Sequence, residues 1–274
     1  MSDALNQAYE SIDRANAGED AATRRKFVAG AAATIGGMGL LGLIDVAEAR
    51  GKKSLKQSSH RPEFRGNLQE ILNVAASVEV LATCINTLAF EKGTAGDEVT
   101  KYNVAAAGRH ELLHHDELVA DFGAKPIATR VYIPDAIFAS RTSLLKAVQN
   151  GDGIFINIYL IATTIAAQRG NGRLARAASE IMGVEAVHRA LARQSLGELG
   201  NDRAFIRFRQ PEDAIGAPDL GRGGFTDVKE ALVRLEAAGI GFDKQTKAPG
   251  QLYDFDELRK RTPNPEGVNT LQFN

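Results

Sequence analysis

The segment Glu111-Leu112-Leu113-His114 contains a Glu-x-x-His pattern that returns at Glu185-Ala186-Val187-His188. Both patterns lie in runs rich in Ala and Leu, which are typical of helices. Residues i and i+3 of a helix project to the same side about one turn apart, so each Glu faces the same way as its His. An acidic residue precedes each pattern at a similar distance, because Glu79 lies 32 residues before Glu111 and Asp152 lies 33 before Glu185. The sequence therefore predicts a helix pair used twice, which indicates a metal-binding four-helix bundle.

The composition favours a helical chain with no bias toward a highly charged partner. The 274 residues include 33 Lys and Arg against 34 Asp and Glu, so net charge gives no reason to expect nucleic acid or anionic lipid as a partner. Trp is absent and aromatic residues make up only 6%, which argues against a β-rich protein. The single cysteine, Cys84, excludes an intrachain disulfide framework and a cysteine-based zinc cluster, and we interpret it as a small buried hydrophobe.

Residues 1–49 have the features of an export signal. The segment Thr23-Arg24-Arg25-Lys26-Phe27-Val28 resembles a twin-arginine signal, and an apolar run at 28–44 and the triplet Ala47-Glu48-Ala49 follow it. We expect cleavage before Arg50, a periplasmic or extracellular mature chain, and no stable membrane insertion after cleavage. A retained membrane anchor is the alternative, which the abundance of Gly and Ala in this short run disfavours.

The remaining chain divides into a basic linker, a helical bundle and an extension. Residues 50–65, which include His60, are predicted to be a linker, and 66–200 to be the bundle. Apolar residues spaced by three and four predict helices over 67–91, 99–121, 141–168 and 173–199. We expect an irregular long link over 122–139 and an interruption of the third helix at Asn150-Gly151-Asp152-Gly153.

Residues 201–274 are predicted to form an irregular C-terminal extension, because prolines and glycines are frequent there. One helix is expected over 226–238, with Thr226 as its N-cap and Gly239 as its stop, and a short one over 253–261. We expect the extension to wrap the bundle or to mediate assembly, for which a homodimer is the simplest form.

The acidic residues share helix faces with apolar ones, so they are predicted to point into the core. In the fourth helix, Glu185 and His188 continue a seam of Leu174, Ala178 and Ile181, spaced by three and four. In the first helix the seam holding Glu79 is broken at Asn86. Burying an unpaired charge costs on the order of several kcal/mol, so four buried carboxylates require compensation. Two divalent cations would balance their four negative charges. Oxygen ligands with one imidazole per ion suit iron or manganese better than zinc or copper.

The chain resembles the ferritin-like superfamily, in particular the exported ferritin-like proteins that include plant and bacterial desiccation-related proteins. The segments that carry the resemblance are Ser77-Val78-Glu79-Val80-Leu81, His110-Glu111-Leu112-Leu113-His114, Tyr132-Ile133-Pro134-Asp135, residues 152–160 and residues 181–188. The resemblance covers about residues 66–200 and implies an all-α, ferritin-like four-helix bundle with a long crossover link. It also implies a centre of two iron or manganese ions per chain, held by Glu79, Glu111, His114, Asp152, Glu185 and His188.

Asp152 departs from the family pattern, in which the third helix usually supplies Glu. Asp is one methylene shorter than Glu. Glycines flank it on both sides, and each glycine weakens the helix by roughly 1 kcal/mol. Two interpretations remain open: Asp152 is a metal ligand, or it is the N-cap of a helix that begins at Gly153. In the second case the site would hold one ion, or would hold its second ion loosely.

Other residues near the pattern have less specific interpretations. We expect His110 to contact a metal ligand without binding the metal itself, and His115 to lie on an exposed or interhelix face. Tyr159 is expected to be a core tyrosine that can hydrogen-bond to a ligand.

Two functions fit these residues. The first is an exported di-iron or di-manganese protein that reacts with O₂ or peroxide, as a ferroxidase, oxidase or catalase. The second is a non-catalytic metal-binding or structural protein of the cell envelope that serves stress or desiccation tolerance. A fold does not determine an activity, so the sequence leaves open whether the protein is an enzyme. A bundle whose polar core residues satisfy one another without metal is also open.

Overall fold

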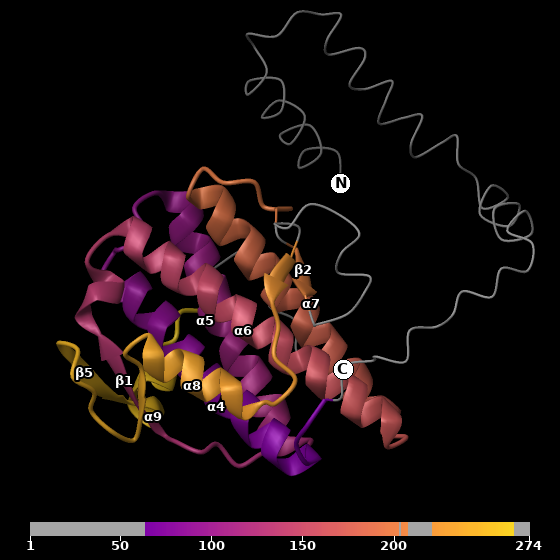
Figure 1. Cartoon of the computed structure of the whole chain (residues 1–274). Coiled ribbons are helices and arrows are strands. Elements are labelled where there is room, and N and C mark those ends of the chain that lie inside the picture. Colours follow the sequence, from indigo (N-terminus) through magenta and orange to yellow (C-terminus); the bar gives the residue numbers. More distant parts are fainter. Residues whose placement is uncertain (1–63, 203, 208–220, 266–274) are drawn as a thin grey trace, which may run out of the picture. The chain divides into compact units, whose positions relative to one another are not determined.

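Four long helices make up most of residues 64–202, 204–207 and 221–265, the part of the chain that the computed structural model describes (Figure 1). They are α4 (Leu68–Glu91), α5 (Glu98–Ala120), α6 (Arg141–Gln168) and α7 (Gly172–Ser195). Helix α4 packs against α5 and α6, and α7 packs against the same two helices. The export signal, His60 and most of the linker lie outside the described residues. The described part is mostly helical, which roughly supports the predicted all-α class, but it also contains small sheets that the sequence did not predict.

Local side chains fix where these helices begin. A polar side chain accepts a hydrogen bond from a backbone N–H of the first turn in each helix, and the four capping residues are Asn67, Asp97, Ser140 and Asn171. The bounds of the first three helices differ from the predicted ones by at most one residue. Helix α7 ends at Ser195, before the predicted 199, because Gly197 adopts a φ of +78° that a helix cannot continue.

Helix α6 continues through the expected interruption, and that prediction is wrong. Its N-cap is Ser140, and Asp152 lies in the helix interior, so the interpretation of Asp152 as an N-cap is also wrong. Buried residues on both sides of this segment, including Leu145, Phe155 and Ile158, pack it against neighbouring helices. Tertiary packing of this kind outweighs the roughly 1 kcal/mol that each glycine costs.

The long link is not irregular but contains the central strand of a sheet. Strand β1 (Arg130–Pro134) pairs antiparallel with β4 (Gly241–Phe242) on one edge and with β5 (Gly250–Asp254) on the other. The 3-10 helix η1 (Asp135–Phe138) follows β1. Val131, Tyr132 and Ile133 are buried, which suits their high strand propensity. Because both partner strands come from the extension, the prediction of an irregular extension is also wrong.

The extension packs its own helices onto the bundle. Helix α8 (Lys229–Ala237) contacts α6, and α9 (Phe255–Leu258), which η3 (Arg259–Arg261) follows, contacts α4. Helix α8 begins three residues after the predicted N-cap, Thr226, and the Asp227 carboxylate accepts a hydrogen bond from Lys229 N at 3.0 Å. A parallel pair, β2 (Phe205–Arg207) and β3 (Gly221–Gly223), precedes α8. The described part of the extension therefore wraps the bundle, which was one of its two expected roles; the other was to mediate assembly.

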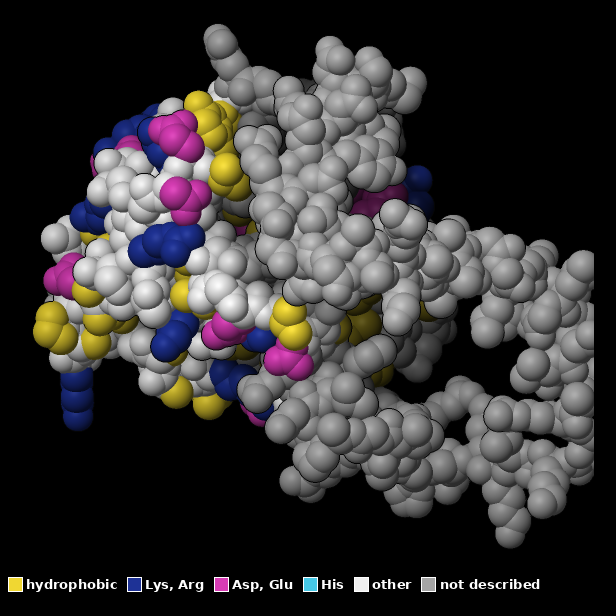
Figure 2. Space-filling model, turned by 90° about the horizontal axis from the view of Figure 1, so that it is seen from above, with side chains coloured by type: hydrophobic (Ala, Val, Ile, Leu, Met, Phe, Trp, Pro, Cys, Tyr) yellow, Lys and Arg dark blue, Asp and Glu magenta, His cyan; other side chains and the backbone are white. Residues whose placement is uncertain are grey.

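Helix α4 is the core helix of this arrangement. It is long and apolar enough to cross a membrane by length and composition, but 89% of its most apolar window is buried within the structure. In contrast, the described surface in Figure 2 carries Lys and Arg interspersed with Asp and Glu. The acidic residues of interest lie on buried helix faces, beneath this mixed surface.

Candidate metal centre

All six predicted ligands are buried, with exposed fractions between 0 and 7%. Each of the four long helices contributes at least one of them: Glu79 from α4, Glu111 and His114 from α5, Asp152 from α6, and Glu185 and His188 from α7. The seams of apolar residues that hold them face the shared interior of the four helices, which explains why charged side chains are carried into the core.

Four of the six form one compact group. Nδ1 of His114 lies 3.4 Å from Glu79 Oε2, 3.2 Å from Glu111 Oε2 and 3.3 Å from Glu185 Oε1. One potential ligand atom from each of these four residues lies within 4.8 Å of the others, so the group can hold a metal ion. Ligand atoms about 2.0–2.2 Å from a shared ion are about 3.0–3.5 Å apart, which matches these separations.

His188 lies at the edge of that group. Its Nδ1 is 3.0 Å from Glu111 Oε1 and 3.8 Å from Glu185 Oε2. Glu111 and Glu185 thus each direct one oxygen toward His114 and the other toward His188. On its outer side, His188 Nε2 lies 3.0 Å from Nδ1 of His110, and the two rings stack with centroids 5.3 Å apart. His110 therefore lies behind a candidate ligand, as expected.

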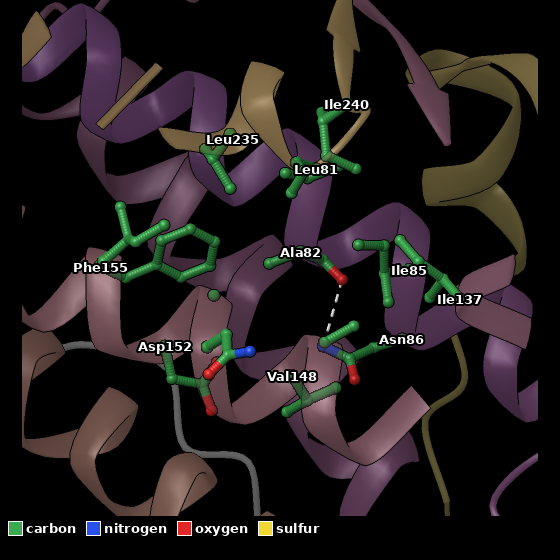
Figure 3. Close-up of a pocket in the computed structure, with 15 residues that line it drawn as sticks. Leu81, Ala82, Ile85, Asn86, Ile137, Val148, Asp152, Phe155, Leu235 and Ile240 are labelled. Carbon is green, nitrogen blue, oxygen red and sulfur yellow. Dashed lines mark hydrogen bonds between the residues drawn. The ribbon is translucent and has the colours of Figure 1, made fainter. Parts of the chain in front are cut away.

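Asp152 is buried near this cluster but outside the group of four. Its exposed fraction is 4%, and it interacts electrostatically with Glu185, His188 and Glu111. Burial, followed by the negative charge of Glu185, raises the pKa of the Asp152 carboxyl well above its usual range. It also lines a pocket on the α8 side of the bundle (Figure 3).

The cluster contains more hydrogen-bond acceptors than donors. Within the described part of the chain, five buried atoms of these residues have no hydrogen-bond partner: Glu79 Oε2, Asp152 Oδ2, both carboxylate oxygens of Glu185, and His188 Nδ1. The one hydrogen that Nδ1 of His114 can carry is directed to Glu111 and cannot serve three carboxylates. An unsatisfied buried polar atom costs about 1–3 kcal/mol, so these atoms are suited to binding a cation together.

The titration of the cluster reflects this concentration of negative charge. Burial and the charge of Glu111 raise the pKa of Glu79 well above its usual range. Burial by itself lowers the pKa of His188, but the Glu111 carboxylate outweighs this effect and raises the pKa to about 10. For His114, the neighbouring carboxylates, led by Glu111, likewise overcome burial and raise its pKa well above the usual value. Protons or metal ions can therefore supply the positive charge that the carboxylates require.

Two further side chains support the candidate ligands, and sequence reasoning described them only loosely. The hydroxyl group of the fully buried Tyr159 in α6 donates a hydrogen bond to Oε1 of Glu79 in α4. Burial, together with the positive charge of neighbouring histidines, lowers the pKa of His110 to about 4, which keeps this imidazole neutral. Metal-ligating residues are commonly held in orientation by such partners. Spacing within one helix could not show either contact, because each joins two helices.

His115 and Cys84 lie apart from the group. His115 is buried on an interhelix face, where Nδ1 contacts Asp116 at 2.9 Å and the ring packs on Phe255 of α9. Arg259 pairs with Asp116 at 2.7 Å, so this cluster connects the extension to α5. Cys84 is buried in the apolar core, and burial raises the pKa of its thiol.

Comparisons of the chain with protein-family models, with curated proteins and with solved structures found no match.

Proposed function

We propose that α4–α7 form a ferritin-like four-helix bundle that holds a dinuclear iron or manganese centre in an exported protein. The observation that carries the proposal is the geometry of Glu111 and Glu185. Each carboxylate directs one oxygen toward His114 and the other toward His188, at 3.0–3.8 Å. Glu111 and Glu185, together with His114 and His188, would hold a pair of ions with one imidazole for each ion. Glu79 and Asp152 would complete the set of ligands.

The donor set supports iron or manganese. Four carboxylates and two imidazoles provide mainly hard oxygen ligands, and two divalent ions balance the four negative charges. The buried oxygens of Glu79, Asp152 and Glu185 that lack hydrogen-bond partners would become ligand atoms. Burial of all six residues excludes bulk water from the site, which strengthens the electrostatic interactions within it.

Such a pair of ions, when bound, supplies redox chemistry with O₂ or peroxide. The protein supplies the surroundings of that chemistry. Tyr159 fixes the orientation of Glu79 through its hydroxyl group, and the ring of His110 stacks on His188 and fixes its position. The activity that we propose is oxidation of Fe(II) or consumption of peroxide in stress protection. The twin-arginine segment at 23–28 supports a location outside the cytoplasm.

One observation favours the second function, a non-catalytic protein of the envelope. His114 already lies within 3.2–3.4 Å of three carboxylates, and the pKa values of both imidazoles are raised. Protons on these histidines can therefore compensate part of the buried negative charge without any metal. The two functions differ in whether the isolated chain retains metal.

Metal analysis of the full chain tests the proposal. We expect about two Fe or Mn ions per chain after purification and anaerobic reconstitution with Fe(II) or Mn(II). The isosteric double variant Glu111→Gln/Glu185→Gln should lose them, because Gln is a far weaker ligand. Glu98→Gln/Glu180→Gln is the matched control, since it makes the same change at exposed positions of the same helices, α5 and α7.

The dinuclear centre is supported if the control retains metal and the Glu111/Glu185 variant does not. Assays of Fe(II) oxidation and peroxide consumption then distinguish an enzyme from a metal-binding protein. A folded parent chain that binds neither ion after reconstitution would exclude the centre and leave the proton-compensated core.

A further inference from the structure

A pocket of about 180 Å³ lies between α4, α6 and α8 and leads to Asp152. Figure 3 shows Asp152 and Asn86 on one side of it and Leu81, Leu235 and Ile240 on the other. Phe155, Ile85 and Val148 add to the apolar wall. Pockets with a mainly apolar lining and a few polar groups are typical of sites for small organic molecules.

The pocket extends from exposed residues to one of the candidate metal ligands, Asp152. Asn150 and Ala238, which line it, are exposed, whereas Asp152 at its inner end is only 4% exposed. Among the described residues that line the pocket, Asp152 is the only one with an ionisable side chain. A ligand that entered from the rim would therefore meet apolar side chains first and a candidate metal ligand last.

The repeat in the sequence explains why space exists here. Tyr159 lies seven residues after Asp152 on α6 and donates a hydrogen bond across the bundle to Glu79 on α4. The equivalent position on α4, seven residues after Glu79, is Asn86, which lines the pocket together with Asp152. Asparagine is much shorter than tyrosine, so the second half of the bundle has no side chain in the place that Tyr159 fills in the first.

This replacement also leaves polar atoms without partners. Asn86 Nδ2 donates to Ala82 O at 3.1 Å, but Asn86 Oδ1 and Asp152 Oδ2 are both buried without a hydrogen-bond partner in the described structure. Asn86 Oδ1 can only accept a hydrogen bond, and a hydroxyl group both donates and accepts, so a ligand with a hydroxyl group would satisfy Asn86 Oδ1 and Asp152 Oδ2 together.

We propose that this pocket binds a small neutral alcohol, with an apolar body about the size of a six-membered ring and its hydroxyl group directed to Asp152 and Asn86. An engineered apolar cavity of about 150 Å³ binds benzene, so the volume suits a body of this size. The role of such a molecule as an organic substrate rests on the proposed dinuclear centre, whereas its binding can be tested without metal.

Benzyl alcohol is the probe, and benzoate and benzylammonium are charged controls of similar size. Binding to the full chain is measured by calorimetry and by ligand-observed NMR, both after treatment with EDTA and after loading with Mn(II). We expect benzyl alcohol to bind in both states, through Asp152 and Asn86 without metal and through Asn86 Oδ1 when Mn(II) occupies Asp152. Both charged analogues should bind at least about tenfold weaker, because the apolar lining does not solvate a charge. Equal binding of the three compounds would overturn the proposal.

Two variants locate the binding site. Gly151→Leu adds a side chain to the pocket wall, at a position where a Cβ would meet only Phe155 Cζ, at 3.8 Å. Asn86→Tyr fills the same space from α4. Gly183→Leu is the matched control, since it also replaces a glycine inside a helix, but at an exposed position of α7 outside the pocket lining.

Both pocket variants should weaken benzyl alcohol binding at least about tenfold, while Gly183→Leu leaves it unchanged; circular dichroism checks that each variant is helical. Binding that is equal in all three variants, or absent from the parent chain, would overturn the pocket assignment. Failure of the metal analysis with benzyl alcohol still bound would instead remove the dinuclear centre and leave the pocket standing as a binding site.

Discussion

The two helical hairpins, α4–α5 and α6–α7, carry the same Glu-x-x-His spacing but differ in how their ligands are held. His114 of the first hairpin lies among three carboxylates at 3.2–3.4 Å, whereas His188 of the second lies at the edge and stacks on His110. Tyr159 donates a hydrogen bond to the upstream carboxylate Glu79, whereas Asp152 Oδ2 is buried without a hydrogen-bond partner in the described part of the chain, and Asp152 lines a pocket. A repeat in sequence has therefore produced two similar backbones and one asymmetric site.

The asymmetry involves residues two turns away from the ligands as well as the ligands themselves, since Asp152 stands where the first half has Glu79. Tyr159 and Asn86 occupy equivalent positions of the two halves, and only the tyrosine reaches across to a carboxylate. Tyr159 thus covers Glu79 in the first half, whereas a pocket lies beside Asp152 in the second. Variants that affect the two halves differently can test this comparison.

Replacing the central histidine should have the largest effect. In the EDTA-treated chain, His114→Ala would remove the imidazole that lies within 3.4 Å of three buried carboxylates, and we expect a loss of about 3–5 kcal/mol in the free energy of unfolding. His188→Ala should cost clearly less, because its Nδ1 lies near two carboxylate oxygens, at 3.0 and 3.8 Å, whereas Nδ1 of His114 lies within 3.4 Å of three. Urea unfolding at pH 7 measures both values.

Equal losses for the two histidine variants would contradict the asymmetry. Binding of Mn(II) gives an independent comparison, since removal of either imidazole should weaken it. A greater loss of stability in His188→Ala than in His114→Ala would show that His188, and not His114, is the central histidine of the cluster.

Removal of the tyrosine hydroxyl group should have an intermediate effect. Tyr159→Phe leaves Glu79 Oε1 buried without its donor, so we expect a loss of about 1–3 kcal/mol. Asn86→Ala, the equivalent site of the other half, removes only a hydrogen bond from Nδ2 to Ala82 O within the same helix and should cost less. Thermal and urea unfolding measure the stability of both variants. If Asn86→Ala lost as much free energy of unfolding as Tyr159→Phe, or more, the proposed difference between the two halves would be contradicted.

The helices were predictable because their signals are local. Apolar seams spaced by three and four, together with Asn67, Asp97 and Asn171 as N-caps, define α4, α5 and the start of α7. The sheet was not predictable, since β1 obtains both of its partner strands from residues more than 100 positions later in the chain. At Asn150-Gly151-Asp152-Gly153 the local signal was misleading, because packing of α6 outweighed the low helix propensity of glycine.

The inward direction of the candidate ligands followed from helix periodicity, but the contacts between helices did not. The spacing of Glu79, Glu111, His114 and Glu185 predicts that each points inward, and the structure brings these four together. The contacts of Tyr159 with Glu79 and of His110 with His188 depend on how neighbouring helices are rotated and shifted. The break in the apolar seam at Asn86 was the one sequence signal of the pocket, and its meaning required the position of Asp152.

The hairpins also differ in how their second helices are capped, which gives the smallest effect. Asp97 caps α5 and pairs with Arg141, whereas the neutral Asn171 caps α7. Hydrogen bonds from Thr100, first from its backbone N–H and then from its side chain, lower the pKa of the Asp97 carboxyl. Because the folded-state pKa is below the unfolded value of about 3.9, this stabilisation is present above pH 4 and is lost as the pH falls through the lowered pKa.

Asp97→Asn keeps a hydrogen-bond acceptor but removes the charge, so the variant should be less stable than the parent chain at pH 6. The difference should shrink toward zero as the pH falls from about 4 to 2, because protonation then makes the parent resemble the variant. Asn171→Asp is the reciprocal change, placing a charged cap on α7, and should make its stability rise with pH over the same range. Thermal unfolding of the three chains between pH 2 and 6 measures this, and a difference between the parent and Asp97→Asn that does not vary with pH would mean that the charge of Asp97 plays no part in capping α5.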